Sequence, residues 1–292
     1  MRPTKQAPPI DKRLMEKVGP RLKTKKALSP ELGLRVLSFV FILVMIVIPM
    51  IVILQDAFRE GFNEFWHQVS LPQAASAIVL TLWTSALMTA VNAIMGLATA
   101  FVLVRYEFPG KRLLNAIIDL PLAIPTLVTG VMLVILYGPQ QVLGAFLKER
   151  IGFEVIFAPP GIVLALLFIT FPFVVRTIQP VLLELDQAQE HAAATLGARG
   201  WTIFRRVIFP ALALPTLSGS LLSFARAVGE FGAVVIVAGN IPFKSQTAAV
   251  YVLGAVESEN RLAASAISVV LITVSLAVIL FTNRVLARRR GA

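Results

Sequence analysis

Hydrophobic residues gather in six blocks along this 292-residue chain, and most of the charged residues lie between the blocks. The blocks cover residues 36–54, 74–104, 113–137, 161–178, 211–238 and 262–281. An α-helix rises about 1.5 Å per residue, so about 20 apolar residues cross a hydrocarbon core that is roughly 30 Å thick. Each block is close to that length or above it. The pattern therefore predicts an all-α polytopic membrane protein with six transmembrane helices.

The first block, Val36–Leu54, has a competing interpretation as the apolar region of a cleaved signal peptide. Such a region would be shorter, about 7–15 residues, and small residues at a cleavage site would follow it. Here the block ends in Ile-Pro-Met-Ile-Val-Ile-Leu, so we expect a retained helix. Residues 34–73 are then expected to form this helix and an external loop, and residues 74–283 the five-span core.

Two of the blocks contain features that simple spanning helices avoid. Residues 74–104 exceed the length that is needed, so their helix must tilt or project from the bilayer. The block at 113–137 contains Asp119, Pro121 and Pro125. Since proline removes a backbone donor, we expect this block to begin with an irregular turn. Asp119 is expected to cap the helix there, and a position lining a pore is the alternative.

Composition and charge narrow the class of protein and orient its helices. The chain is 57% hydrophobic and 15% charged, whereas about 25% of the residues of a soluble domain are charged. Most of its 27 lysines and arginines lie in the N-terminal tail, in 105–112, in 176–210 and after residue 283. Because basic loops remain in the cytoplasm, both termini and the 176–210 loop are predicted to be cytoplasmic. The net charge of +11 is thus mainly a topology signal, and no nucleic-acid partner is expected.

Both ends of the chain are basic. Residues 1–33 are rich in Lys, Arg and Pro and have few apolar side chains. We therefore expect a disordered cytoplasmic tail whose basic groups contact anionic membrane lipid. Residues 284–292 are expected to form a short basic cytoplasmic C-terminus.

Several classes of enzyme and metal site are excluded by residue types and motifs. Cysteine is absent, and the two histidines, His67 and His191, lie far apart in the sequence, which excludes disulfides, thiolate sites and a histidine metal cluster. The chain has no phosphate loop of the form G-x-x-x-x-G-K-[ST], no G-x-S-x-G and no H-E-x-x-H. We therefore expect a non-catalytic conduit without catalytic residues, a metal or a cofactor of its own.

The segment between the fourth and fifth blocks, residues 185–210, is the most informative part of the chain. Its first half, Leu185–Gly197, contains strong helix formers, with Asp186 near its start and a glycine at its end, as helices prefer. Its second half begins after Gly200 and predicts a short amphipathic helix that Pro210 breaks. The apolar side of this helix consists of Ile203, Phe204 and Val207, and the basic side of Arg205 and Arg206.

Small side chains in the first of these helices suggest contact with another protein. Ala192 and Ala193 would allow a partner's backbone to approach closely, so the helix could seat in a groove. The alternative is an ordinary alanine-rich surface helix that ends at a glycine, since such helices are common.

The same loop resembles the E-A-A-x3-G-x9-I-x-L-P signature of permease subunits of binding-protein-dependent ABC importers. Ala192, Ala193, Gly197 and Pro210 match it at the family spacing, and Val207 and Phe209 replace its Ile and Leu conservatively. The resemblance implies a type-I ABC importer permease fold, with a cytoplasmic coupling helix between spans 4 and 5 that docks into the ATPase subunit. His191 departs from the signature, which has Glu there. Glu190, about 100° away on a helix, is the candidate substitute for that charge.

Further segments resemble the T-type inner-membrane subunits of sulfate/thiosulfate importers, and this resemblance extends from about Val36 to the C-terminus. The segments are 105–112, 119–125, 171–180 and 229–240. The resemblance implies a multi-pass subunit of a bacterial cytoplasmic (inner) membrane that moves the oxyanion by alternating access. It also implies a second permease subunit (a W-type paralogue), an ATPase dimer that holds Mg-ATP, and an external sulfate/thiosulfate-binding protein.

Two other functions remain open from the sequence. A molybdate/tungstate ABC permease is the near alternative, because the 229–233 stretch, Gly-Glu-Phe-Gly-Ala, is similar in molybdate permeases. An ATP-independent anion transporter or channel is the alternative from a different class, and the predicted docking helix argues against it.

Arg226 and Glu230 lie within the fifth block, at membrane depth. They are four residues apart, so a continuous helix would place them on one face. Charged groups at this depth are costly and normally point into a helix bundle or a wet cavity. The pair is therefore expected either to line the pathway as a gate for the oxyanion or to form a structural ion pair.

Overall fold

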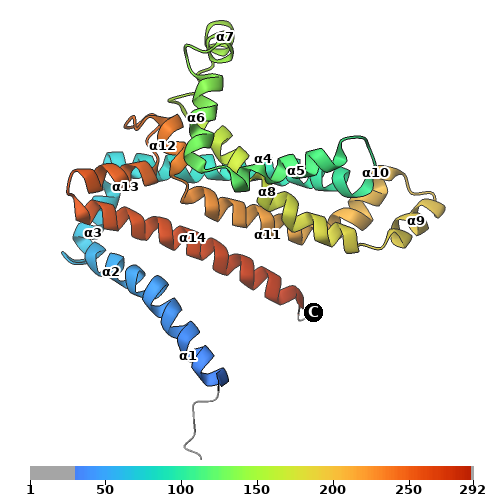
Figure 1. Ribbon diagram of the computed structural model, residues 1–292, viewed down its shortest axis with the longest axis horizontal. Coiled ribbons are helices and arrows are strands. Elements are labelled where there is room, and N and C mark those ends of the chain that lie inside the picture. The colour runs from blue at the N-terminus through green and yellow to red at the C-terminus, as the bar shows by residue number, and fades with distance from the viewer. Residues whose placement is uncertain (1–29, 291–292) are drawn as a thin grey trace, which may run out of the picture. The chain divides into compact units, whose positions relative to one another are not determined.

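The computed structural model describes the backbone of residues 30–290 and the side chains of residues 32–284 (Figure 1). Within this range the secondary structure is helical, and no strand is found in it. Five helices are long and apolar enough to cross a membrane, and a bent pair of shorter helices makes a sixth candidate span. The all-helical prediction with six apolar segments is thus confirmed. The predicted disordered tail, residues 1–33, lies almost wholly outside the described residues.

The described chain divides after Ile51 into two compact units. The first begins with α1 (Pro30–Ile42), which passes through a π-helical turn, η2 (Leu43–Val47), into α2 (Ile48–Ala57). In η2 the backbone N–H of Ile48 donates to the oxygen of Leu43, five residues earlier. This wider turn directly precedes Pro49, whose ring would clash with a carbonyl in a regular α-helix. The apolar segment continues through the proline.

The second unit contains a bundle of long helices. They are α4 (Pro72–Arg105), α8 (Pro159–Glu184), α11 (Phe209–Val228) and α14 (Arg261–Arg290), preceded by the short α3 (Phe62–Ser70). Figure 1 shows α4, α8 and α11 lying side by side, and α14 packs against α11. These helices correspond to the predicted second, fourth, fifth and sixth blocks, with somewhat wider bounds except at the end of the fifth.

The predicted third span is two helices, α5 (Lys111–Ala123) and α6 (Thr126–Tyr137), and the chain bends by 111° between them. The irregular turn therefore lies in the middle of the segment and not at its start. Ile124 adopts an extended conformation (φ −82°, ψ 128°), because the ring of Pro125 disfavours a helical conformation in the residue before it. Asp119 lies inside α5, so the prediction that it caps the helix is wrong.

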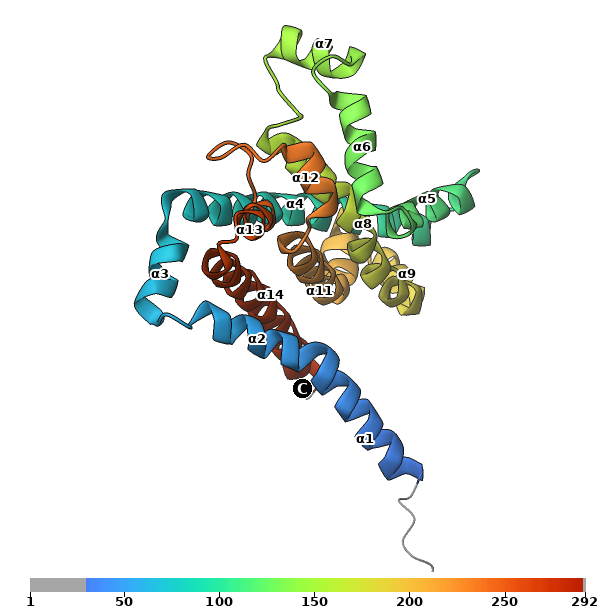
Figure 2. The same cartoon turned by 60° about the vertical axis from the view of Figure 1, so that its left-hand side comes forward.

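The fifth span also differs from its prediction. It ends at Val228, and after a break of three residues a separate short helix, α12 (Gly232–Ala238), begins. Figure 2 shows α12 beside α6. A β-carbon at Gly232 would lie 2.1 Å from the Thr126 hydroxyl oxygen, so any side chain there would require Thr126 to shift. The two breaks thus meet where α6 and α12 begin. The short α13 (Ala248–Glu257) then leads to α14.

Buried polar contacts and small residues hold the bundle together. The amide of Asn92 on α4 donates to the Thr170 hydroxyl of α8 (2.9 Å), and the Ser223 hydroxyl of α11 donates to the Thr170 carbonyl (3.2 Å). A β-carbon at Gly96 would lie 2.7 Å from Val174, so α4 and α8 are in close contact there. Small residues and polar contacts of this kind are what drives helix association in a membrane.

Candidate functional site

The loop between α8 and α11 contains the predicted helix, α9 (Gln187–Thr195). The Asp186 carboxylate accepts a hydrogen bond from the backbone N–H of Ala188 (2.8 Å) and so caps the helix. Gly197 ends it in a left-handed conformation (φ 84°), which glycine adopts without the strain that a side chain would cause. The predicted start and end of this helix are confirmed.

The second half of the loop differs from its prediction at Pro210. A short turn of helix, α10 (Gly200–Ile203), passes through a π-helical turn, η3 (Phe204–Ile208), directly into α11. The N–H of Phe209 donates to the Phe204 oxygen, five residues earlier, as occurs before Pro49. Because the wide turn accommodates the proline, Pro210 does not break the helix.

The amphipathic character of this second half is confirmed. Ile203 and Phe204 pack on a buried cluster that includes Leu103 of α4, while Arg205 and Arg206 are exposed. The loop is therefore fixed on the ends of the long helices.

Glu190 connects α9 to the rest of the chain. Its Oε1 lies 2.5 Å from Nη2 of Arg105, at the end of α4, and the two side chains are only 19% and 9% exposed. The same guanidinium nitrogen lies 3.4 Å from the carbonyl oxygen of Leu185. His191, which stands at the signature's acidic position, is exposed. The carboxylate of Glu190 thus faces its own chain, whereas the imidazole of His191 faces outward.

Large apolar side chains are exposed around the small residues of this loop. Leu196 is 89% exposed and Trp201 72%, and the indole of Trp201 stacks on Phe204 with ring centroids 5.5 Å apart. Ala192 and Gly197 are also exposed, and Ala193 is half-buried. Exposed apolar groups beside small residues are typical of surfaces that contact other proteins. We call the surface formed by α9, Leu196 and Trp201 the docking surface. Sequence reasoning identified its small residues but missed Leu196 and Trp201, since no periodicity distinguishes them from core residues.

Arg226 and Glu230 form an ion pair, with Nη1 2.6 Å from Oε2. Arg226 lies in the last turn of α11, whereas Glu230 lies beyond the end of that helix, so the prediction of a shared helix face is wrong. The Glu230 side chain is 2% exposed and that of Arg226 39%. The other carboxylate oxygen of Glu230 accepts the backbone N–H of Ala233 (3.2 Å). The pair therefore bridges the break between α11 and α12.

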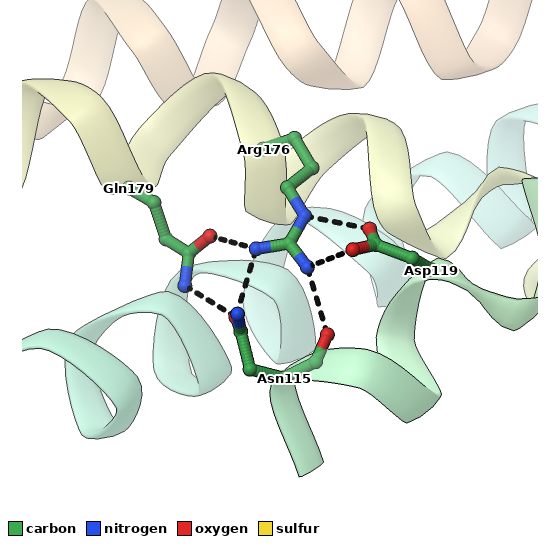
Figure 3. A network of polar contacts seen from close by, with 4 residues as sticks. All are labelled: Asn115, Asp119, Arg176 and Gln179. Atoms are coloured by element: carbon green, nitrogen blue, oxygen red, sulfur yellow. Dashed lines mark hydrogen bonds and ion pairs between the residues drawn. The ribbon is translucent and has the colours of Figure 1, made fainter. Parts of the chain in front are cut away.

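A third charged group at membrane depth, Arg176 of α8, was not singled out from the sequence. Its guanidinium donates from Nε to Asp119 Oδ1 (2.7 Å) and from Nη2 to Asp119 Oδ2 (2.5 Å). Nη1 donates to the side-chain oxygens of Asn115 (2.8 Å) and Gln179, and Nη2 also donates to the Asn115 carbonyl (2.8 Å). All five N–H groups therefore have acceptors, as Figure 3 shows. We call these four residues the Arg176 network.

The sequence contained a signal for this network. Arg176 was counted among the cytoplasmic basic residues, and Asp119 was expected at a helix cap. Both lie inside apolar blocks, and an unpaired charge there would be costly. Opposite charges in two different blocks therefore indicate a pair, although the sequence does not show which blocks are neighbours.

A further ion-pair cluster lies outside the spans. Glu154, in the loop after α7 (Val142–Ile151), lies 2.9 Å from Lys148 and 3.2 Å from Lys244. Hydrogen bonds from the two ammonium groups lower the pKa of Glu154 below its ordinary value. The cluster joins α7 to the loop before α13. Among the side chains that the structure describes, residues 32–284, no three His, Asp or Glu residues gather as metal ligands would.

Comparison with known proteins gives a family match and similar sequences. The family model for the inner-membrane component of binding-protein-dependent transport systems matches residues 92–291. A probable sulfate transport system permease protein of Chlorokybus atmophyticus is 46% identical over 82% of this chain and 83% of that protein. The sulfate transport system permease proteins of Synechocystis sp. and Escherichia coli are 42% and 36% identical, over 85% and 87% of this chain and 86% and 91% of theirs.

Solved structures show a similar fold. A chain of a bacterial alginate ABC transporter, crystallised with a periplasmic protein that holds an alginate pentasaccharide, superposes with a TM-score of 0.72. It is 18% identical in sequence, and the match covers 86% of this chain and 92% of that chain. The fold described above is thus one that occurs in ABC importers.

Proposed function

Since the chain belongs to the family of inner-membrane components of binding-protein-dependent transport systems, we propose that it is the pathway-forming permease subunit of an ATP-driven sulfate and thiosulfate importer. The sulfate permeases compared above are 36–46% identical to it over at least four fifths of its length. This similarity is the observation that carries the proposal. The chain supplies the pathway, and ATP hydrolysis takes place on separate ATPase subunits that hold Mg-ATP.

The docking surface is the proposed contact with the ATPase. Ala192 and Gly197 leave room for a partner's backbone, and Trp201 is a large apolar anchor beside them. Aromatic anchors in closely packed surroundings contribute most of the free energy of typical protein interfaces. We therefore expect α9 to enter a groove of the ATPase, with Leu196 and Trp201 covered on assembly.

Two connections would transmit movement of the docked helix to the spans. The Arg105–Glu190 pair ties α9 to α4, and α10 continues through η3 into α11 without a break. When the ATPases close on ATP, the loop, α4 and α11 would therefore move together as a rigid body. Such movement opens the pathway outward, and the return opens it inward, which is alternating access.

Other partners complete the proposed importer. The two charged pairs at membrane depth suit a pathway shared with a second permease subunit, the W-type paralogue, because charges do not face lipid. An external sulfate/thiosulfate-binding protein would deliver the oxyanion. The basic residues near both ends and in the docking loop favour an orientation in a bacterial inner membrane with both termini cytoplasmic.

Uptake of [35S]sulfate by proteoliposomes that contain the complete complex tests this function. We expect uptake to require both ATP and the ATPase subunits, and thiosulfate to compete with sulfate more strongly than molybdate does. Uptake that continues without the ATPase would support an anion channel or secondary transporter instead. Stronger competition by molybdate would support a molybdate/tungstate permease.

A further inference from the structure

The Arg176 network has a form that suits an oxyanion site. The guanidinium presents Nε and Nη2 side by side to the two oxygens of Asp119, at 2.7 and 2.5 Å. This two-point geometry is the one by which arginine binds carboxylates and tetrahedral oxyanions alike. The carboxylate of Asp119 therefore occupies the position that two oxygens of a sulfate would take (Figure 3).

The position of the network in the spans points to a wet pathway. Arg176 lies about two helical turns, roughly 12 Å, before the end of α8, and Asp119 lies about as far after the start of α5. The side chain of Arg176 is nevertheless 30% exposed and that of Asp119 48%. Charged groups at such depth face a water-filled cavity or a protein partner and not lipid. The exposed side of the pair would be accessible to an ion where it faces a pathway between this chain and a second permease subunit.

A cavity lies beside the network, next to the loop between α4 and α5, and Arg176 and Asp119 themselves are not in its lining. Its volume is about 720 Å³, and Asn115 and Gln179 of the network line it together with Lys111 and Arg112. Glu107 is the acidic residue in its lining and is paired with Lys111 (2.6 Å). The cavity therefore has a basic lining on the side that the charge pattern assigns to the cytoplasm, which suits the release of an anion.

The carboxylate of Asp119 is exposed and is held by Arg176 alone within the described chain, unlike that of Glu230. Within the described chain, Arg176 supplies all the hydrogen bonds that Asp119 accepts, and the Asp119 side chain is 48% exposed. Glu230 is buried and is held by both Arg226 and the backbone of Ala233. Of these two ion pairs, Arg176–Asp119 can therefore open without leaving a buried charge unpaired, whereas Arg226–Glu230 cannot.

We propose that Arg176 is the contact for the oxyanion in the inner half of the pathway, and that Asp119 is a built-in counter-anion which the oxyanion displaces. In the empty state Asp119 holds the guanidinium in the geometry for binding and keeps the site neutral. When a divalent tetrahedral oxyanion arrives, it takes the Nε and Nη2 donors. Asn115 and Gln179 retain their contacts with Nη1 and so keep the guanidinium in place. Return of Asp119 then favours release of the anion. This inference rests on the proposed function.

Binding of [35S]sulfate to the detergent-purified complex, without the external binding protein, tests the displacement. Asp119→Asn removes the competing charge, and we expect it to lower the Kd for sulfate about tenfold or more, since charge-assisted contacts to a guanidinium are strong. Asp56→Asn is the matched control, because that carboxylate accepts a hydrogen bond from Ser265 outside the network, and its Kd should equal that of the unmodified complex. A purely structural pair would give no gain in affinity on Asp119→Asn, and that result overturns the proposal.

Uptake in proteoliposomes tests the role of Arg176. Arg176→Lys retains the charge but loses the planar two-point donor, so we expect sulfate uptake to fall at least about tenfold. The exchanged pair, Asp119→Arg with Arg176→Asp, should remain inactive because the cation no longer sits beside Asn115 and Gln179. If the exchanged pair instead takes up sulfate normally, or assembles where the single variants do not, the two residues form a structural ion pair. Either result would overturn the proposal. Failure of the proposed function is distinguishable, because then the unmodified complex itself takes up no sulfate.

Discussion

Arg105 at the end of α4 and Glu190 in the first turn of α9 are joined by a contact of 2.5 Å that is largely shielded from solvent. The residues are 85 positions apart in sequence, so the contact fixes the docking helix to a span that is not its neighbour in the chain. A buried pair of this kind adds little to net stability compared with an apolar pair, but losing one partner is costly. Its value here is therefore positional, since it ties α9 to α4.

Glu190→Gln tests this mechanical role. The variant keeps a hydrogen-bond acceptor but loses the charge, which we expect to cost about 1.5–3 kcal/mol at this contact. The ATPase should still co-purify, because the outward face of α9 is unchanged, whereas ATP-driven sulfate uptake per complex should fall several-fold. Glu154→Gln is the control, since the Glu154–Lys148 pair (2.9 Å) also joins a carboxylate to a cation but lies outside the docking surface and the Arg176 network, and this variant should leave uptake unchanged. Equal uptake by both variants would contradict the mechanical role.

Gly197→Val should release the ATPase. Gly197 has φ 84° and an open surrounding, so a side chain there meets no atom of this chain but strains the left-handed backbone and projects onto the docking surface. β-Branched residues tolerate this conformation poorly, at a cost of roughly 1–2 kcal/mol. Co-purification of the ATPase with the permease in detergent measures the effect.

Gly152→Val is the matched control for that experiment. Gly152 also has a positive φ (70°) and open space around it, but it ends α7, far along the chain from the docking surface. We expect this variant to suffer similar strain and to retain the ATPase. If both glycine variants lose the ATPase equally, the effect comes from backbone strain and not from the docking surface.

The sequence predicts the spans and the capped docking helix, because hydropathy, length and capping are local properties. Asp186 and Gly197 could be recognised for that reason. The effect of each proline could not be predicted in the same way. The helix continues through Pro49 and Pro210 by means of a π-helical turn, whereas Pro125 ends α5. Which outcome occurs depends on how neighbouring helices pack, and α6 turns aside to meet α12.

The charged pairs could also be predicted only in part, because contacts between different segments depend on how the helices pack. Arg226 and Glu230 are close in sequence, so their pairing was predictable, although the helix break between them was not. Arg176 and Asp119 are 57 residues apart, and their contact exists only because α5 lies against α8. A pattern within one segment cannot reveal such a contact.

Arg226→Ala is expected to lower both stability and transport, while the complex still assembles. It leaves the Glu230 carboxylate, 2% exposed, without its counter-charge, and such a loss costs about 3–5 kcal/mol in buried pairs. In the double variant Arg226→Ala with Glu230→Gln, the unpaired charge is removed and the acceptor for the Ala233 N–H is kept. Thermal unfolding of the purified complex should therefore show a higher Tm for the double variant than for Arg226→Ala alone.

Sulfate uptake by the same two variants separates a pathway role of Arg226 from a structural one. If the cation attracts the oxyanion, uptake should remain at least several-fold below normal even where stability is restored. If the double variant transports at the normal rate, the pair serves only to hold α11 and α12 together.

The Glu154 cluster predicts a pH dependence of the loop after α7. Because Lys148 and Lys244 lower the pKa of Glu154, its ionised form favours the folded state. This stabilisation is present above the ordinary carboxyl pKa of 4.5 and is lost as the pH falls through the lower pKa of the folded protein.

Glu154→Gln removes this stabilisation at every pH. We therefore expect a lower Tm for Glu154→Gln than for the unmodified protein at pH 7, and a difference that shrinks steadily as the pH falls below 4.5. Glu149→Gln neutralises a carboxylate on the adjacent α7 and should show no such trend, because the described lysines and arginines form no ion pair with it. A difference between Glu154→Gln and the unmodified protein that stays constant down to low pH would mean that the ion pairs do not stabilise this loop.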